Sequence, residues 1–144
     1  MTTATSQATL GKMYIDGQWC GSDSGRTLDV INPATEEVIA PVAYGGRAET
    51  RLALEAAQRA LPSWMKATPY ERAKVLKRTA ELMRERADTI ARTMTMEQGK
   101  PVAESKAEVL HSADTFEWFA EEGKRAYGQV IPPSVSAKRH LTIK

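Results

Sequence analysis

The sequence lacks most of what would indicate a secreted, membrane-spanning or metal-bound protein. It contains a single cysteine, Cys20, which excludes an internal disulfide and fits a reducing compartment such as the cytoplasm. No apolar run approaches the roughly 18 residues of a membrane span, so no membrane partner is expected. The two histidines, His111 and His140, lie far apart and lack companion ligands at metal-binding spacing.

An excess of charge of one sign is also missing. The chain has 20 basic and 18 acidic residues, for a net charge of +2, and the two signs alternate along it. A nucleic-acid surface needs clustered basic residues, so no nucleic-acid partner is expected. A length of 144 residues with 42% hydrophobic content predicts one globular domain with a core. Residues 1–12 have no apolar stretch and predict a disordered tail rather than a signal peptide.

No recognisable catalytic group is present. Cys20 has no base or oxyanion donor in its own stretch, so we interpret it as a small, half-buried apolar side chain. Gly99-Lys100 lacks the upstream glycine of a phosphate-binding loop, and Gly45-Gly46 lacks the third glycine of a dinucleotide-binding loop. A freestanding enzyme that uses Cys20 is therefore a remote hypothesis.

The first third of the chain carries β-hairpin patterns. In Met13–Cys20 the pair Asp16-Gly17 lies between apolar residues, and both positions of such a tight turn favour positive φ. A strand is predicted over Thr27–Ile31. A turn follows over residues 32–36, and a second strand is predicted over residues 37–42.

The middle of the chain has apolar residues at the spacing of α-helices. Residues 48–61 carry an alanine stripe that predicts close packing on a neighbour, and Pro62 is expected to end that helix. Thr68-Pro69-Tyr70-Glu71 is a capping box, which predicts the start of a long helix that runs to Gln98.

The stretch Met96–Pro101 predicts a corner between two long helices. Gly99 is placed to end one helix in a left-handed conformation, and Pro101 is placed as the first residue of the next, which is expected to reach Tyr127. Glu97 would lie at a helix C-terminus, where the dipole disfavours a carboxylate. It would need a basic neighbour, water or a bound cation.

The C-terminal stretch predicts a strand over residues 140–144, after an extended segment that begins at Val130. No partner for this strand was identified within the chain, and natural domains avoid such an exposed edge. The sequence therefore indicates a piece of a longer protein.

Four stretches resemble, in order and spacing, the N-terminal region of the aldehyde dehydrogenase superfamily: Tyr14–Trp19, Ile31–Thr35, Glu97–Pro101 and Glu117–Arg125. The last most resembles the succinate-semialdehyde dehydrogenase branch. The resemblance covers Tyr14 to Lys144. It implies the first part of an α/β, Rossmann-like fold. The segment itself is then α+β, with N-terminal β hairpins, three to four helices and a C-terminal β arm.

The resemblance also implies how the chain is divided and what the whole enzyme does. Residues 13–128 would begin the nucleotide-binding domain, and residues 129–144 would begin the arm through which subunits form a homo-oligomer, a dimer or a tetramer. Such enzymes oxidise succinate semialdehyde, or a related semialdehyde, to the carboxylic acid with NAD or NADP through a cysteine thiohemiacetal and thioester. Their nucleophilic Cys, base Glu and oxyanion Asn would lie beyond Lys144. The segment alone is expected to be inactive and to bind no cofactor.

Two further sets of residues are implied by the resemblance alone. The backbone carbonyls of Val30 and Ile31, with the Glu97 side chain, would bind a structural Na+ or K+. An exposed or salt-bridged Glu97 is the alternative. In the second long helix, His111, Ser112 and Phe116 would border the aldehyde tunnel. The rival functional hypothesis is a short, non-catalytic interaction protein that pairs through its C-terminal strand.

Overall fold

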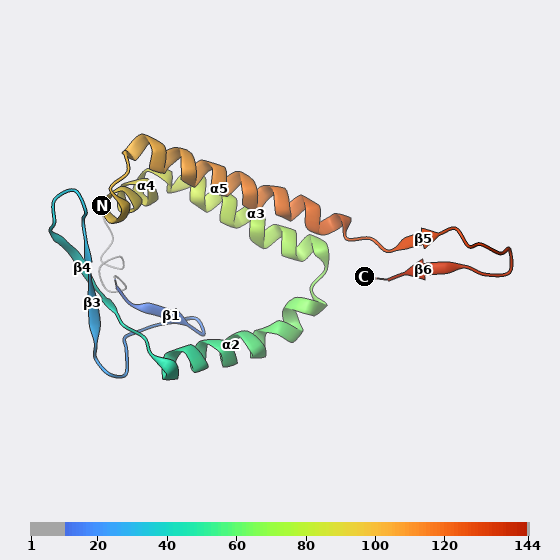
Figure 1. Ribbon diagram of the computed structural model, residues 1–144, viewed down its shortest axis with the longest axis horizontal. Coiled ribbons are helices and arrows are strands. Elements are labelled where there is room, and N and C mark those ends of the chain that lie inside the picture. The colour runs from blue at the N-terminus through green and yellow to red at the C-terminus, as the bar shows by residue number, and fades with distance from the viewer. Residues whose placement is uncertain (1–10, 144) are drawn as a thin grey trace. The chain divides into compact units, whose positions relative to one another are not determined.

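The computed structural model describes residues 11–143 (Figure 1). The tail predicted over residues 1–12 lies, as far as residue 10, outside the described residues. The Gly11 carbonyl accepts a hydrogen bond of 2.6 Å from the Ala43 amide. The chain divides into two compact units. The first reaches Lys66 and also includes Asp88–Ala107, and the second comprises Ala67–Ala87 and Glu108–Lys144.

The first unit contains two antiparallel hairpins. Strand β1 (Met13–Ile15) pairs with β2 (Gln18–Cys20), and Asp16 and Gly17 between them have φ values of 52° and 77°, which confirms the predicted tight turn. Strand β3 (Thr27–Ile31) pairs with β4 (Val38–Ala43), with an irregularity between the last two residues of β3. The strand predicted over residues 37–42 corresponds to β4, which lies one residue further along the chain.

Helix α2 (Arg47–Lys66) contradicts two predictions. Pro62 lies inside the helix rather than at its end. The proline falls in the final turns, and Ser63 Oγ donates a hydrogen bond of 2.8 Å to the Ala60 carbonyl. Proline lacks the N–H that would bond to the carbonyl four residues earlier, so the helix passes through Pro62 with one backbone hydrogen bond fewer. The alanine stripe on α2 is mostly exposed, so the close packing expected there is absent from the described part of this unit.

Helix α3 (Pro69–Glu85) starts at the predicted capping box. The Glu71 amide donates to Thr68 Oγ1 at 3.2 Å, and the Thr68 amide donates to Glu71 Oε2 at 2.7 Å. The single long helix predicted to reach Gln98 is wrong, because Arg86, with φ −107° and ψ 12°, separates α3 from α4 (Ala87–Gln98). Both Ala80 and Ala87 are buried, so the apolar stripe continues across the break and periodicity alone does not reveal it.

The corner at Gly99 forms as predicted, with φ 76°. Helix α5 (Val102–Glu122) starts one residue later than expected, and the Pro101 carbonyl accepts its first hydrogen bond from the Ser105 amide at 3.0 Å. The α-helix ends at Glu122 and continues as the 3₁₀ turn η1 (Gly123–Arg125), short of the predicted Tyr127.

In the second unit, α3 and the later part of α5 lie side by side (Figure 1). Their buried residues are almost all small, which allows two helix backbones to approach closely. These residues are Ala73 and Ala80 on α3, and Val109, Ala113 and Ala120 on α5. On α5 the buried residues Val109, Ala113 and Ala120 recur at helical spacing, whereas Val102 in the first turn is exposed.

Strand β5 (Gln129–Ile131) pairs with β6 (His140–Thr142), so the expectation that the last strand has no partner within the chain is wrong. The pairing is closed by the Gln129 amide, which donates to Thr142 Oγ1 at 2.8 Å. All residues of both strands are exposed. No helix within residues 11–143 combines the length and hydropathy needed to cross a bilayer.

Large apolar side chains remain uncovered in the second unit. Trp118, Phe119, Tyr127 and Leu141 are all more than half exposed. Surfaces of this kind drive association in water. We expect the isolated chain to self-associate and to melt without a sharp cooperative transition. Light scattering coupled to size-exclusion chromatography would measure this, and a monodisperse, cooperatively melting monomer would contradict it.

Candidate functional site

The corner between α4 and α5 is tightly built within the first unit. A Cβ added to Gly99 would lie 2.9 Å from Cγ of Pro33, so the Asn-Pro turn after β3 rests against the corner. The hydroxyls of Thr95 and Ser105 are 2.9 Å apart, and Ser105 is fully buried. The side chain of Glu97, in the last turn of α4, is exposed at the end of the helix.

The structure places the three residues of the expected cation site in this same unit. Val30 is half-buried and Ile31 exposed, at the end of β3. Glu97 lines a groove of about 340 Å³ that consists of α4 residues only. Carbonyl and carboxylate oxygens are suitable donors for a hard monovalent cation. However, no cluster of three or more His, Cys, Asp or Glu side chains among residues 11–143 has metal-binding geometry. The cation site stays a prediction.

The expected tunnel residues all lie on α5. Ser112 and Phe116 are four residues apart and therefore share a face of the helix, whereas His111 is rotated away from them. Ser112 is half-buried, His111 is exposed, and 37% of the Phe116 surface is accessible. The structure therefore brings together two of the three residues.

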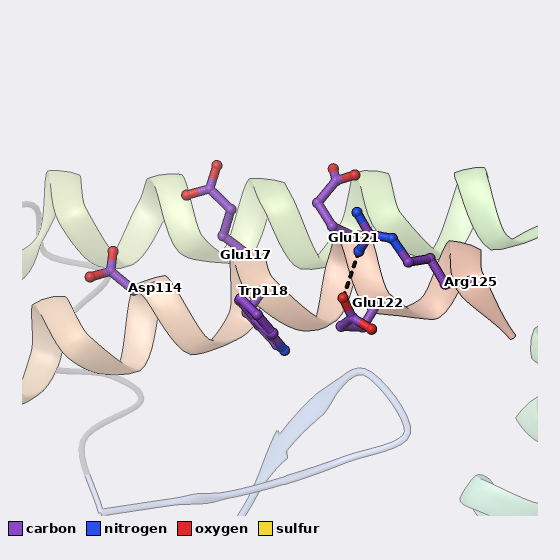
Figure 2. Close-up of a pocket in the computed structure, with 6 residues that line it drawn as sticks. All are labelled: Asp114, Glu117, Trp118, Glu121, Glu122 and Arg125. Atoms are coloured by element: carbon purple, nitrogen blue, oxygen red, sulfur yellow. Dashed lines mark hydrogen bonds and ion pairs between the residues drawn. The ribbon is translucent and has the colours of Figure 1, made fainter.

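A groove of about 560 Å³ runs along another face of α5 (Figure 2). Figure 2 shows Glu117 and Glu121 projecting to one side of the helix and Trp118 to the other. The residues that line the groove are Asp114, Glu117, Trp118, Glu121, Glu122 and Arg125. The carboxylates of Glu121 and Glu122 are both in ion pairs.

Basic residues from α3 neutralise this acidic face. Arg84 Nη2 lies 2.7 Å from both Asp114 Oδ1 and Glu117 Oε2. Lys77 Nζ lies 2.7 Å from Glu121 Oε1. Sequence analysis missed these pairs, because the partners are 30 or more residues apart and no local pattern joins them.

The Glu121 carboxylate is held by two ammonium groups. The hydrogen bond from Lys77, followed by that from Lys124, lowers the pKa of Glu121 from its ordinary value of 4.5 to about 2. Because the folded pKa lies below the unfolded one, Glu121 contributes stability fully above pH 4.5. That contribution is lost progressively as the pH falls toward about 2.

We therefore expect Glu121→Gln to flatten the pH dependence of α3–α5 stability between pH 4.5 and about 2. Hydrogen exchange of the α3 and α5 amides across this pH range measures the effect. Glu104→Gln, on the same helix but outside the groove, is the matched control. An unchanged pH slope in Glu121→Gln would show that the two lysines do not hold this carboxylate ionised.

Glu49 is a buried carboxylate that sequence analysis did not single out. Only 7% of it is exposed, and it accepts hydrogen bonds from the amides of Asp23 at 2.8 Å and Gly46 at 2.7 Å. These bonds, the Asp23 amide first, lower the pKa of Glu49. Its position three residues after Gly46, at the start of α2, was the available signal, since carboxylates favour this position.

Cys20 lies half-buried in β2 and lines a groove of about 240 Å³ with Asp16, Glu49 and Arg59. No histidine lines this groove, and the Glu49 carboxylate is already occupied by backbone amides. This geometry provides no base and no oxyanion pocket for a cysteine nucleophile. The interpretation of Cys20 as a structural side chain is consistent with its place in the fold.

Comparison with known proteins gives one family. The profile of the aldehyde dehydrogenase family matches residues 19–144. The glutarate-semialdehyde dehydrogenase of Pseudomonas putida is 53% identical over 131 residues, which cover 91% of this chain and 27% of the relative. The NADP(+) succinate-semialdehyde dehydrogenase of Escherichia coli is 48% identical over 130 residues, which cover 90% of this chain and 27% of the relative.

The structural comparison agrees. The crystal structure of an E. coli NADP dependent enzyme matches with a TM-score of 0.90 and 45% identity, over 96% of this chain and 29% of that chain. This confirms the expected fold class, an α+β segment of the Rossmann-like aldehyde dehydrogenase fold. The chain spans about a quarter of the length of the curated relatives it matches. The chain belongs to the aldehyde dehydrogenase family.

Proposed function

We propose that this chain is the N-terminal segment of an NAD(P)+-dependent dehydrogenase that oxidises the semialdehyde of a short dicarboxylic acid. Glutarate and succinate semialdehyde are the two candidate substrates. The observation that carries the proposal is the identity of 53% and 48% with relatives named for these two substrates. The NADP named for both E. coli proteins favours NADP+ as the oxidant.

We infer that the described residues form no dinucleotide site. The N-terminus of α2, which follows Gly45-Gly46, is the helix end most similar to a phosphate cradle. Its Gly46 amide is already bonded to the Glu49 carboxylate at 2.7 Å, and this negative charge would repel a pyrophosphate. The N-terminus of α3 is likewise capped by the Glu71 side chain. The cofactor and the catalytic residues are therefore expected to lie on other parts of the enzyme.

Helix α5 carries the residues expected to contact the aldehyde. Ser112 and Phe116 share one face of this helix because they are four residues apart. We propose that this face borders the passage by which the aldehyde reaches the catalytic centre, with His111 nearby. We also propose that Glu97, with the carbonyls of Val30 and Ile31, binds a Na+ or K+ ion that stabilises the corner.

The substrate proposal is tested by expressing the complete enzyme that carries this segment. Formation of reduced nicotinamide is followed with glutarate semialdehyde, succinate semialdehyde and pentanal, an aldehyde of similar length without the distal carboxylate. We expect at least one semialdehyde to give a higher kcat/KM than pentanal, and the segment alone to be inactive. An equal kcat/KM for pentanal and the semialdehydes would overturn the proposed substrate class. Activity of the segment alone would overturn the proposal that the catalytic residues lie on other parts of the enzyme.

The cation proposal has a separate test. Glu97→Gln keeps the shape of the side chain but removes its charge. If the carboxylate binds a cation, then replacement of K+ or Na+ by a bulky organic cation lowers the melting temperature of the parent enzyme and has a smaller effect on the variant. An identical response in both proteins would show that Glu97 is an exposed carboxylate without a bound cation.

We further propose that the β5–β6 hairpin mediates assembly into a cytoplasmic dimer or tetramer. Its strands are short and exposed, and each has a free edge that can accept another strand. The same observation supports the second candidate function, a short non-catalytic partner that pairs through β6 with a complete subunit. Size-exclusion chromatography of this chain with the complete enzyme tests whether the chain pairs with a complete subunit. Co-elution supports strand pairing, and separate elution counts against it.

A further inference from the structure

The turn between β1 and β2 contains the only Asp-Gly pair in the sequence, Asp16-Gly17. It is open to solvent, and 65% of the Asp16 side chain is exposed. A Cβ added to Gly17 would meet only the hydroxyl of Tyr14, at 3.9 Å, so the space beside the Gly17 Cα is open. Glycine after aspartate leaves the following amide unhindered, and an amide in this position can react with the aspartate side chain.

The reaction is an isomerisation that needs only water. The Gly17 nitrogen attacks Cγ of Asp16, and a new N–C bond closes a five-membered succinimide ring. The carboxyl group reacts in its protonated form, so its C–OH bond breaks and the hydroxyl leaves as water with the proton lost from the amide. Water then adds to one of the two ring carbonyls. Opening on one side restores aspartate, and opening on the other gives isoaspartate, whose main chain passes through Cβ and Cγ.

The fold restrains this reaction through the backbone and through one side chain. Asp16 and Gly17 are both in the left-handed region, with φ 52° and 77°, and the attack requires the turn to rearrange. Arg59 Nη2, on α2, lies 2.8 Å from Asp16 Oδ2 and ties the carboxylate to that helix. A hairpin with three residues in each strand is marginally stable without such an anchor.

We propose that Asp16-Gly17 is a site of spontaneous aspartate isomerisation and that Arg59 slows the reaction by anchoring the Asp16 carboxylate to α2. Isoaspartate adds one carbon to the main chain within a two-residue turn. It would therefore disturb the adjacent Ile15–Gln18 pair and the register of the hairpin. The ion pair with Arg59 accordingly protects the integrity of the first hairpin as the protein ages.

The test compares three forms of the purified protein incubated at neutral pH: the parent, Arg59→Ala and Arg51→Ala. Arg51 is the matched control, because it lies on the same helix and pairs with Glu55 rather than with the hairpin. Peptide mapping by mass spectrometry, with fragmentation that separates aspartate from isoaspartate, measures the product at residue 16. Loss of an exposed ion pair should raise the rate in Arg59→Ala about two- to fivefold. Arg51→Ala should match the parent.

Two outcomes would overturn the proposal. Equal rates in the parent and Arg59→Ala would show that the anchor has no effect. An equal rise in Arg51→Ala would assign the effect to general loosening of α2, which hydrogen exchange of the α2 amides would reveal independently. Asp16→Glu, which disfavours the five-membered ring, should abolish the signal, and its persistence would place the reaction elsewhere. All of these results are independent of any dehydrogenase activity.

Discussion

Replacement of Gly99 by alanine is expected to open the α4–α5 corner. The residue has φ 76°, a conformation that costs an L-residue about 1–2 kcal/mol. In addition, the new Cβ would lie 2.9 Å from Cγ of the Pro33 ring, which has little freedom to move away. Overpacking of this kind adds roughly 1–3 kcal/mol. Together the two effects predict a loss of about 2–5 kcal/mol in local stability.

Hydrogen exchange of the amides around the corner measures this loss as a reduced opening free energy. Gly123→Ala is the matched control, because nothing lies within 4 Å of its added Cβ and its φ is not positive. In the double variant Gly99→Ala/Pro33→Ala, the stability lost through the clash with the Pro33 ring should be recovered. The stability lost through the left-handed backbone at residue 99 should remain lost. A corner as stable in Gly99→Ala as in Gly123→Ala would contradict the packing described here.

Replacement of Ala113 by leucine should separate α3 from α5. Ala113 is completely buried, and the contact between the helices is formed largely by alanine, so no space remains for three further carbon atoms. Overpacking of such a seam typically costs about 1–3 kcal/mol, and displacement of the whole helix raises the cost toward the upper value. Exchange protection should fall along both helices rather than at residue 113 alone.

Thr115→Leu provides the comparison for Ala113→Leu. Thr115 is exposed on the same helix, and loss of its hydroxyl removes one bond of 3.0 Å to the His111 carbonyl. A leucine there should change stability by less than about 0.5 kcal/mol. If Ala113→Leu were tolerated as well as Thr115→Leu, the two helices could not be packed as closely as the alanine seam implies.

The parts of the fold that sequence analysis predicted correctly are set by local rules. The turn at Asp16-Gly17, the capping box at Thr68 and the left-handed Gly99 each depend on a few adjacent residues. Their φ preferences and backbone hydrogen bonds are nearly independent of what lies around them. For the same reason the motifs that carry the family resemblance could be read from short stretches, and the family assignment agrees with them.

The candidate site was predictable only in part. Glu97 was correctly placed at a helix end, and Ser112 and Phe116 were correctly placed on one helix. The role of Glu49 was missed, because its second amide donor, Asp23, comes from a loop 26 residues earlier in the chain. The sequence of one helix contains no pattern that indicates a hydrogen-bond donor from a distant loop.

Local chemistry alone thus determined where most turns and helix starts lie, because each depends on backbone preferences of adjacent residues. Tertiary contacts decided what those preferences leave undetermined. The break at Arg86 lies between the buried residues Ala80 and Ala87, and Arg84 pairs with Asp114 and Glu117 on α5. These features depend on which surfaces meet when α3 and α5 pack, and burial and ion pairing between distant residues do not exist until the chain has folded.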